Sequence, residues 1–233
     1  MVHSIHRKIA ILGLVIAAAH LACACATQAS STMATEMNVT TQMRVDNFLT
    51  RGIDKVQTGD YQGAEADFSR VIQLKPDLAD AYLNRGVARM NLGNAQGSIA
   101  DFDQAIQLDS QFADAYLNRG VALLNLGNGQ QAMQDFNQAI QLTTSSAEAA
   151  TIYFNRGQAR YYLGDQPGSL EDLNQAIELD PNLAEAYGNR GKIRYDLGDQ
   201  AGAIEDWQHA AQLFFKQGAV EDYQIVLELL ESL

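Results

Sequence analysis

The chain has 233 residues and a formal net charge of −12, from 28 acidic and 16 basic side chains. This balance disfavours nucleic-acid binding, which needs a clustered basic surface. It keeps the protein soluble and can steer basic partners toward it. The length suits one repeat-built domain rather than two separate globular ones.

The first 26 residues have the pattern of a secretory signal peptide. A short basic start ends at Lys8, an apolar run follows over residues 9–19, and small residues continue to Ala26. The run is too short to span a bilayer, so we expect export, to the periplasm or another extracytoplasmic compartment, with cleavage after Ala26. Two alternatives stay open. One is an uncleaved membrane anchor, and the other is a lipoprotein lipidated at Cys23, although His20 departs from the lipoprotein pattern.

Cleavage after Ala26 would remove both cysteines, so neither a disulfide nor a cysteine-based zinc site is expected. The loss of Arg7 and Lys8 would also change the net charge from −12 to −14. Residues 27–44 are rich in Ser, Thr and Met and have no sustained period. They are predicted to form a flexible tether.

A repeat with a period near 34 residues organises the chain from residue 45 onward. Five Arg-Gly pairs set its frame, and their glycines are 34, 34, 37 and 34 residues apart. An aromatic residue precedes each glycine by four positions, a second glycine follows by seven, and a bulky residue follows by sixteen. The frame glycines are Gly52, Gly86, Gly120, Gly157 and Gly191, and the bulky residues are Phe68, Phe102, Phe136, Leu173 and Trp207.

Each unit contains two apolar stripes at helical spacing. In the unit 79–112 the first stripe, around Tyr82 and Gly86, stops at Gly93, because glycine tolerates the left-handed backbone of a helix C-terminus. The second stripe includes Phe102 and Ala105. Neither stripe can be buried within one hairpin, so successive hairpins are expected to stack on each other.

This pattern resembles the tetratricopeptide repeat. The resemblance covers residues 45 to about 217 and implies an all-α fold, a right-handed α-solenoid of five helical hairpins. The apolar face of Val220, Tyr223 and Val226 predicts a capping helix over residues 218–233. The hairpins are expected at 45–78, 79–112, 113–149, 150–183 and 184–217.

Two departures from the family pattern recur together. The residue before each frame glycine is arginine, where the family commonly has leucine, and an aspartate follows sixteen residues later. Because arginine is planar and always charged, we expect ion pairs between the two helices of each hairpin. Independent, solvated charges are the alternative. The pairs would be Arg51–Asp67, Arg85–Asp101, Arg119–Asp135, Arg156–Asp172 and Arg190–Asp206.

In tetratricopeptide proteins the first helix of each hairpin lines a concave groove. The resemblance therefore places a row of asparagines there, similar to the asparagine ladder by which some relatives hold a peptide backbone. An amide suits this role because it both donates and accepts. The alternative is that each asparagine bonds within its own helix or to a neighbouring repeat. The expected groove residues are Asn84, Asn118, Asn155, Asn189, Val87, Met90, Val121, Leu124, Phe154, Gln158, Tyr161, Tyr162, Lys192 and Tyr195.

Catalytic motifs are scarce in this sequence. Most glycines recur in the register of the repeat, so no phosphate-binding loop is expected, and cleavage would leave His209 as the single histidine. A nucleophilic triad or a multi-histidine metal site then lacks its residues. We expect no enzyme activity, cofactor or metal, but a protein-interaction scaffold outside the cytoplasm that binds an extended peptide or helix of a partner and serves complex assembly. A self-associating structural repeat protein is the alternative.

Overall fold

The computed structural model describes residues 37–231, and the elements in this range are α-helices joined by short turns. An N-terminal helix occupies residues 37–57. It is followed by α2 (Tyr61–Leu74), α3 (Ala79–Asn91), α4 (Ala95–Leu108), α5 (Ala113–Asn125), α6 (Gly129–Leu142), α7 (Ser146–Tyr162), α8 (Gln166–Leu179), α9 (Ala184–Asp196), α10 (Gln200–Gln217) and α11 (Val220–Glu231).

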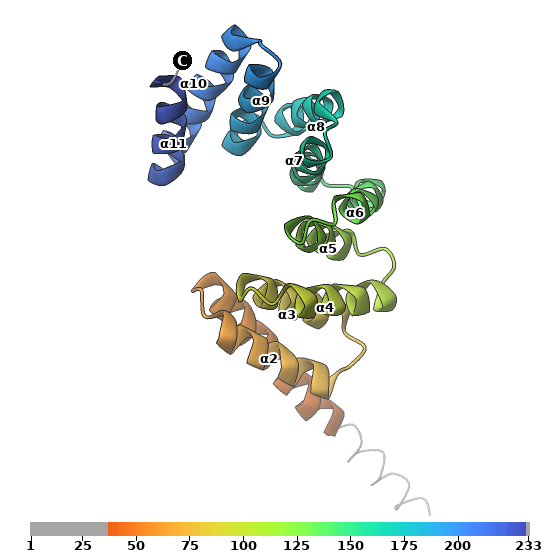
Figure 1. Ribbon diagram of the computed structural model, residues 1–233. Coiled ribbons are helices and arrows are strands. Elements are labelled where there is room, and N and C mark those ends of the chain that lie inside the picture. The colour runs from red at the N-terminus through yellow and green to blue at the C-terminus, as the bar shows by residue number, and fades with distance from the viewer. Residues whose placement is uncertain (1–36, 232–233) are drawn as a thin grey trace, which may run out of the picture.

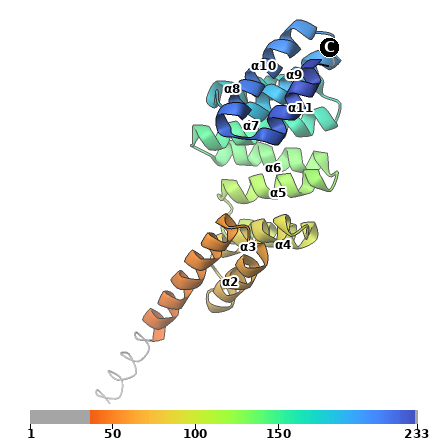
Figure 2. The same cartoon turned by 90° about the vertical axis from the view of Figure 1, so that its left-hand side faces the viewer.

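Consecutive helices pair into hairpins, and the hairpins stack side by side along a curved axis (Figures 1 and 2). The first hairpin joins the N-terminal helix to α2, and the next four are α3–α4, α5–α6, α7–α8 and α9–α10. In Figure 1, α5 and α7 lie on the inner side of the curve, and α6 and α8 lie on its outer side. The all-α solenoid of five hairpins is therefore confirmed.

The hairpins share small cores with their neighbours instead of one central core. Phe136 of α6, for example, is buried in one cluster with Ile152 and Ala159 of α7. Leu173 of α8 and Ile193 of α9 belong to another cluster of the same kind. Burial across each junction is what a stack of hairpins needs, because stability then comes from contacts between neighbouring units.

Two expected boundaries are wrong. The predicted tether, 27–44, includes residues 37–44, which are helical. Each residue added to a formed helix gains a hydrogen bond without repeating the cost of nucleation. The boundary after residue 149 is also wrong, since α7 begins at Ser146. The Ser145 hydroxyl accepts the Glu148 backbone N–H at 3.4 Å and caps this longer helix. The signal peptide over 1–26, Cys23 within it, residues 27–36 and residues 232–233 lie outside the described residues.

Each frame glycine lets the two helices of its hairpin approach closely. A Cβ added to Gly120 would lie 2.6 Å from Cε1 of Phe136, on the facing helix. The aromatic ring at Phe136 is fully buried and has no room to move away. At Gly157 the facing residue is Leu173, and the nearest atoms to an added Cβ are 3.3 Å away. The facing residues therefore leave more room for an added methyl group at Gly157 than Phe136 leaves at Gly120.

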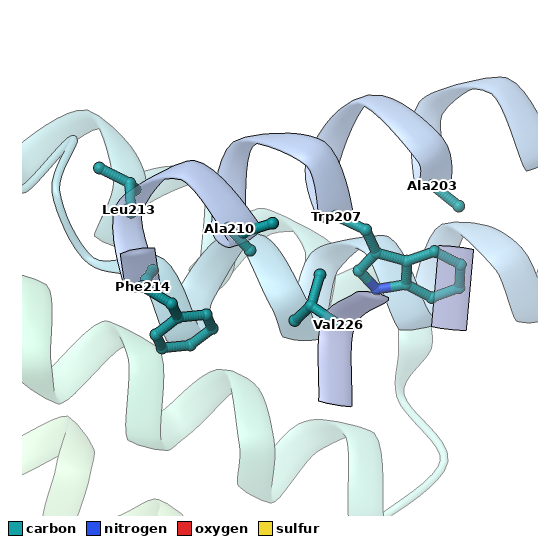
Figure 3. Close-up of a cluster of buried hydrophobic side chains, with 8 residues drawn as sticks. Ala203, Trp207, Ala210, Leu213, Phe214 and Val226 are labelled. Atoms are coloured by element: carbon teal, nitrogen blue, oxygen red, sulfur yellow. The ribbon is translucent and has the colours of Figure 1, made fainter. Parts of the chain in front are cut away.

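The C-terminal helix α11 packs against the extended last helix of the stack. Helix α10 has 18 residues and ends at Gly218, whose φ of 73° lies in the left-handed region. Val226 of α11 is buried in a cluster with Trp207 and Phe214 of α10 (Figure 3). The predicted capping helix is thus present over Val220–Glu231. None of the described helices combines the length and the apolar character needed to cross a membrane.

The glycine contacts predict unequal effects of the same substitution. Gly120→Ala should lower the free energy of unfolding by about 1–3 kcal/mol, because overpacking a full core forces strained side chains. Gly157→Ala should be near neutral, because alanine favours helix by about 0.5–1 kcal/mol over glycine and only small shifts of Asp172 and Leu173 are required. Urea unfolding of the two variants measures this difference, and equal losses would contradict the packing argument.

Candidate functional site

A ladder of arginine–aspartate pairs links the two helices of every hairpin, as the sequence predicts. In each pair Nε of the arginine donates to Oδ2 of the aspartate at 2.7–3.0 Å. Nη2 donates to Oδ1, at 2.6 Å in the last four hairpins. The aspartates are only 2–5% exposed. Two parallel bonds from one guanidinium fix the relative position of the two helices, which single point charges could not do. The pairs are Arg51–Asp67, Arg85–Asp101, Arg119–Asp135, Arg156–Asp172 and Arg190–Asp206.

The third nitrogen of the guanidinium reaches the preceding hairpin. Nη1 of Arg156 donates to Oδ1 of Asn137 on α6 at 2.7 Å, and Nη1 of Arg190 donates to Oδ1 of Asn174 on α8 at 2.7 Å. Arg119 contacts Oδ1 of Asp103 on α4 at 2.6 Å in the same way. The same side chain therefore closes its own hairpin and binds the neighbouring one.

Aromatic rings cover the guanidinium groups from one side. In every hairpin the aromatic residue three positions before the arginine lies under its guanidinium, with Cζ 5.0–5.6 Å from the ring centroid. Such cation–π contacts stabilise a charge that is partly removed from water. The neighbouring carboxylate of Asp135 raises the pKa of Arg119 above its usual value, and the guanidinium of Arg51 lowers the pKa of Asp67.

The ladder predicts that the same arginine substitution costs more in the third hairpin than in the fourth. Arg156→Leu leaves Asp172 with a second cation, since Nη1 of Arg160 lies 3.3 Å from its Oδ2. Arg119→Leu leaves Asp135 buried without any cation, which costs about 3–5 kcal/mol. Urea unfolding should show the larger loss for Arg119→Leu. Losses of the same size would mean that the second cation contributes nothing.

The asparagine row bonds mainly within its own helices. Nδ2 of Asn84, Asn118 and Asn155 donates to the backbone carbonyl four residues earlier, at 2.7–2.8 Å. This is the local alternative that the sequence left open. The Nδ2 groups of these three residues are therefore occupied, while their amide oxygens can still accept a hydrogen bond from a ligand.

A pocket of about 120 Å³ brings together five of the predicted groove residues. It lies between α7 and α9, and its floor includes Ser169, Leu173 and Ile193. Tyr162 at its rim is 74% exposed, the largest exposed fraction of any large hydrophobic residue in the described range. The five predicted residues are Gln158, Tyr161, Tyr162, Asn189 and Lys192.

Asp196 orders one side of this pocket. The Tyr161 hydroxyl donates to its Oδ2 at 3.0 Å, and the ammonium group of Lys192 forms an ion pair with its Oδ1. The ion pair lowers the pKa of Asp196, and the hydrogen bond to this carboxylate raises the pKa of Tyr161. Tyr161 and Asp196 belong to neighbouring hairpins, so the contact also holds the pocket walls at a fixed separation.

The remaining predicted groove residues lie elsewhere. Val121 and Leu124 pack against the cluster around Phe136, and Phe154 packs against the cluster around Leu173. Tyr195 contacts the ring of Trp207 at 5.8 Å between centroids, which is the packing role left open for it. Val87 and Met90 are half-buried on α3, away from the pocket.

No feature of the sequence points directly to the floor of the pocket. Ser169 and Leu173 lie on α8, the second helix of its hairpin, whereas the expected groove used first helices alone. The Ser169 hydroxyl donates to the Gly157 carbonyl at 2.7 Å and is fully buried. His209 stacks on Tyr187, with ring centroids 4.4 Å apart. Within residues 37–231 no group of three His, Cys, Asp or Glu side chains is arranged to hold a metal ion.

Three family models for the tetratricopeptide repeat match residues 49–111, 113–142 and 157–198, together more than half of the chain. The chain therefore belongs to the tetratricopeptide repeat family, whose members are typically non-catalytic scaffolds for protein interactions. No curated protein sequence matches it significantly.

Solved structures share the fold. A crystal structure of MamA protein is 23% identical, with a TM-score of 0.61, over 76% of this chain and 94% of MamA. PilF of Pseudomonas aeruginosa is 16% identical, with a TM-score of 0.70, over 82% and 92%. YrrB, described as a tetratricopeptide repeat protein with an unusual peptide-binding site, is 17% identical, with a TM-score of 0.59, over 79% and 90%. These likenesses confirm the right-handed α-solenoid.

Proposed function

We propose that the pocket between α7 and α9 is the centre of a groove that binds an extended peptide segment of a partner protein. The observation that carries this proposal is the gathering of two amides, two tyrosines and a lysine from successive first helices around one pocket. Tyrosine supplies contact area at interfaces, and amides pair with a peptide backbone whatever its side chains are. The peptide-binding site named for YrrB supports this use of the fold.

The chemistry of the pocket favours a peptide over a small cofactor. Its volume, about 120 Å³, is smaller than the range of about 300–1,000 Å³ typical of cofactor sites, and it suits a single side chain. Gln158 and Asn189 have no hydrogen bond to another described protein group, so their amides can pair with a peptide unit. Lys192 is held by Asp196, which leaves the pocket without a large excess of either charge.

Replacing both unpaired amides tests the backbone contact. The double variant Gln158→Ala, Asn189→Ala should bind at least about 30-fold more weakly, since it strands two peptide groups and each costs about 1–3 kcal/mol. Its melting temperature should stay close to that of the parent, because neither amide bonds within the fold. The ligand is a dodecapeptide selected from a random display library on residues 27–233, and fluorescence anisotropy measures its affinity.

Two exposed aromatic residues supply a matched control for the pocket. Tyr162 and Phe215 are 74% and 72% exposed, but Phe215 lies on α10, outside the pocket. Tyr162→Ala should weaken the binding of the selected peptide, whereas Phe215→Ala should leave its affinity unchanged. Equal effects of the two variants on the affinity would contradict binding at the pocket. An effect of Phe215→Ala alone would place the binding surface at the C-terminal end and favour self-association.

We further propose that the protein acts outside the cytoplasm, where it assembles complexes. The support is the signal-peptide pattern of residues 1–26. Mass spectrometry of the native protein should then find a chain that starts at Thr27, or one that starts at a lipidated Cys23. An intact Met1 in the exported fraction would contradict cleavage, and a protein confined to the cytoplasm would contradict export.

A further inference from the structure

A second cation contacts the buried aspartate in four of the five hairpins. It lies one helical turn after the ladder arginine, so that both cations reach the same carboxylate. Lys55 lies 2.8 Å from Asp67, Arg89 2.8 Å from Asp101, Arg160 3.3 Å from Asp172 and Arg194 2.9 Å from Asp206. In each case the acceptor is Oδ2, which also accepts from Nε of the ladder arginine.

Three of these cations also bond the backbone at the start of the second helix. Lys55 donates to the carbonyl of Gly63 at 3.3 Å, Arg160 to that of Gly168 at 2.7 Å, and Arg194 to that of Gly202 at 3.3 Å. The receiving site for the second cation thus consists of one carboxylate oxygen and one carbonyl oxygen. Both groups are acceptors, so the site is built for a donor that carries positive charge.

The third hairpin has this receiving site without its cation. Leu123 occupies the position of Lys55 and Arg89, and Asp135 is paired with Arg119 alone. A hollow of about 320 Å³ lies there, and Leu123, Asp103 and Asp135 are among its lining residues. Two carboxylates and one guanidinium leave the hollow with a net charge of −1. The side chain of Asp135 is only 7% exposed, whereas that of Asp103 is 55% exposed, so the hollow combines one buried and one solvated carboxylate.

The start of α6 departs from the other second helices at the same place. Four of them have glycine three positions after the N-cap, and there an added Cβ would lie 2.1–2.5 Å from the capping side chain. In α6 this position is Gln131, and the side chain of Asn128 makes no capping hydrogen bond. Gln131 stands where the other second helices have this glycine, and it is among the residues that line the hollow.

We propose that this hollow receives a lysine or arginine side chain of a partner protein, which takes the place of the second cation that the third hairpin lacks. The charged end would bond Oδ2 of Asp135, as Arg160 bonds Asp172. Its methylene stem would lie along Ile99 and Leu123, because long basic side chains bury their stems on apolar surface. The hollow is lined by α4, α5 and α6, so it is separate from the pocket between α7 and α9.

The test titrates labelled protein, residues 27–233, with a defined probe and follows it by NMR. The probe is an acetylated, amidated hexapeptide with a single central arginine, and the matched peptide carries citrulline, which has the same shape without the charge. We expect saturable shifts of the Gln131 and Gln134 amides and the Leu123 methyl groups, with citrulline at least about tenfold weaker. The proposal would be overturned if these groups show no chemical-shift changes, or if both peptides bind with the same affinity.

Three variants with the same change in net charge show where the probe binds. Leu123→Arg supplies the missing cation from within the chain and should abolish binding without lowering the melting temperature. Asp103→Asn removes the exposed acid of the hollow and should weaken binding severalfold. It leaves the Arg119–Asp135 pair intact, so it still tests the proposal if Leu123→Arg fails to fold. Leu197→Arg, at an exposed position after α9, should leave binding unchanged.

Two outcomes of this series contradict the proposal. If Leu197→Arg weakens the binding of the probe as much as Asp103→Asn does, binding reflects only the overall negative charge of the protein. If a folded Leu123→Arg variant binds as well as the parent, the probe lies elsewhere. Tyr162→Ala should have no effect on the binding of this probe. A result that contradicts binding at the hollow can therefore be distinguished from one that contradicts binding at the α7–α9 groove.

Discussion

The guanidinium group of the ladder arginine is the contact on which the stack depends. Two of its nitrogens hold the aspartate of the facing helix, and the third reaches the preceding hairpin. Apolar burial alone is not directional, and small core residues such as Ala139 and Ala159 would allow neighbouring hairpins to slide. The fork of hydrogen bonds sets the register between them. Its energetic contribution is moderate, because desolvation of the charges offsets much of the attraction.

The arginine ladder also bears on where the two proposed binding surfaces lie. A stack held at every junction can tolerate irregular hairpins, and both candidate surfaces lie at irregularities. The fourth unit follows the 37-residue spacing and begins with the long helix α7. The extra turn of α7 lies at its N-terminal end, and Tyr161 and Tyr162 lie at its C-terminal end beside the pocket. The third unit replaces a cation by Leu123 and a glycine by Gln131, and the hollow lies there. The regular hairpins supply the frame, and the irregular ones contain the two surfaces proposed to bind partners.

The sequence predicts the regular part of this structure well and the irregular part poorly. Helix positions follow from the 34-residue period, and the Arg–Asp pairs follow because two departures from the family pattern recur at a constant spacing. The local bonds of Asn84 and Asn118 could not be predicted, since pairing with a helix carbonyl or with a ligand suits an amide equally. The hollow could not be predicted either, because the second cation becomes recognisable only when its contact with the aspartate is seen.

The most direct test of this account is a double-mutant cycle in the third hairpin, where the pair has no second cation. Arg119→Leu, Asp135→Phe and the double variant would be compared by urea unfolding. The account predicts that the double variant, with an apolar pair, is more stable than the sum of the single losses implies, with a coupling energy of about 0.5–3 kcal/mol. A coupling indistinguishable from zero would mean that the Arg119–Asp135 pair does not hold the two helices of its hairpin together.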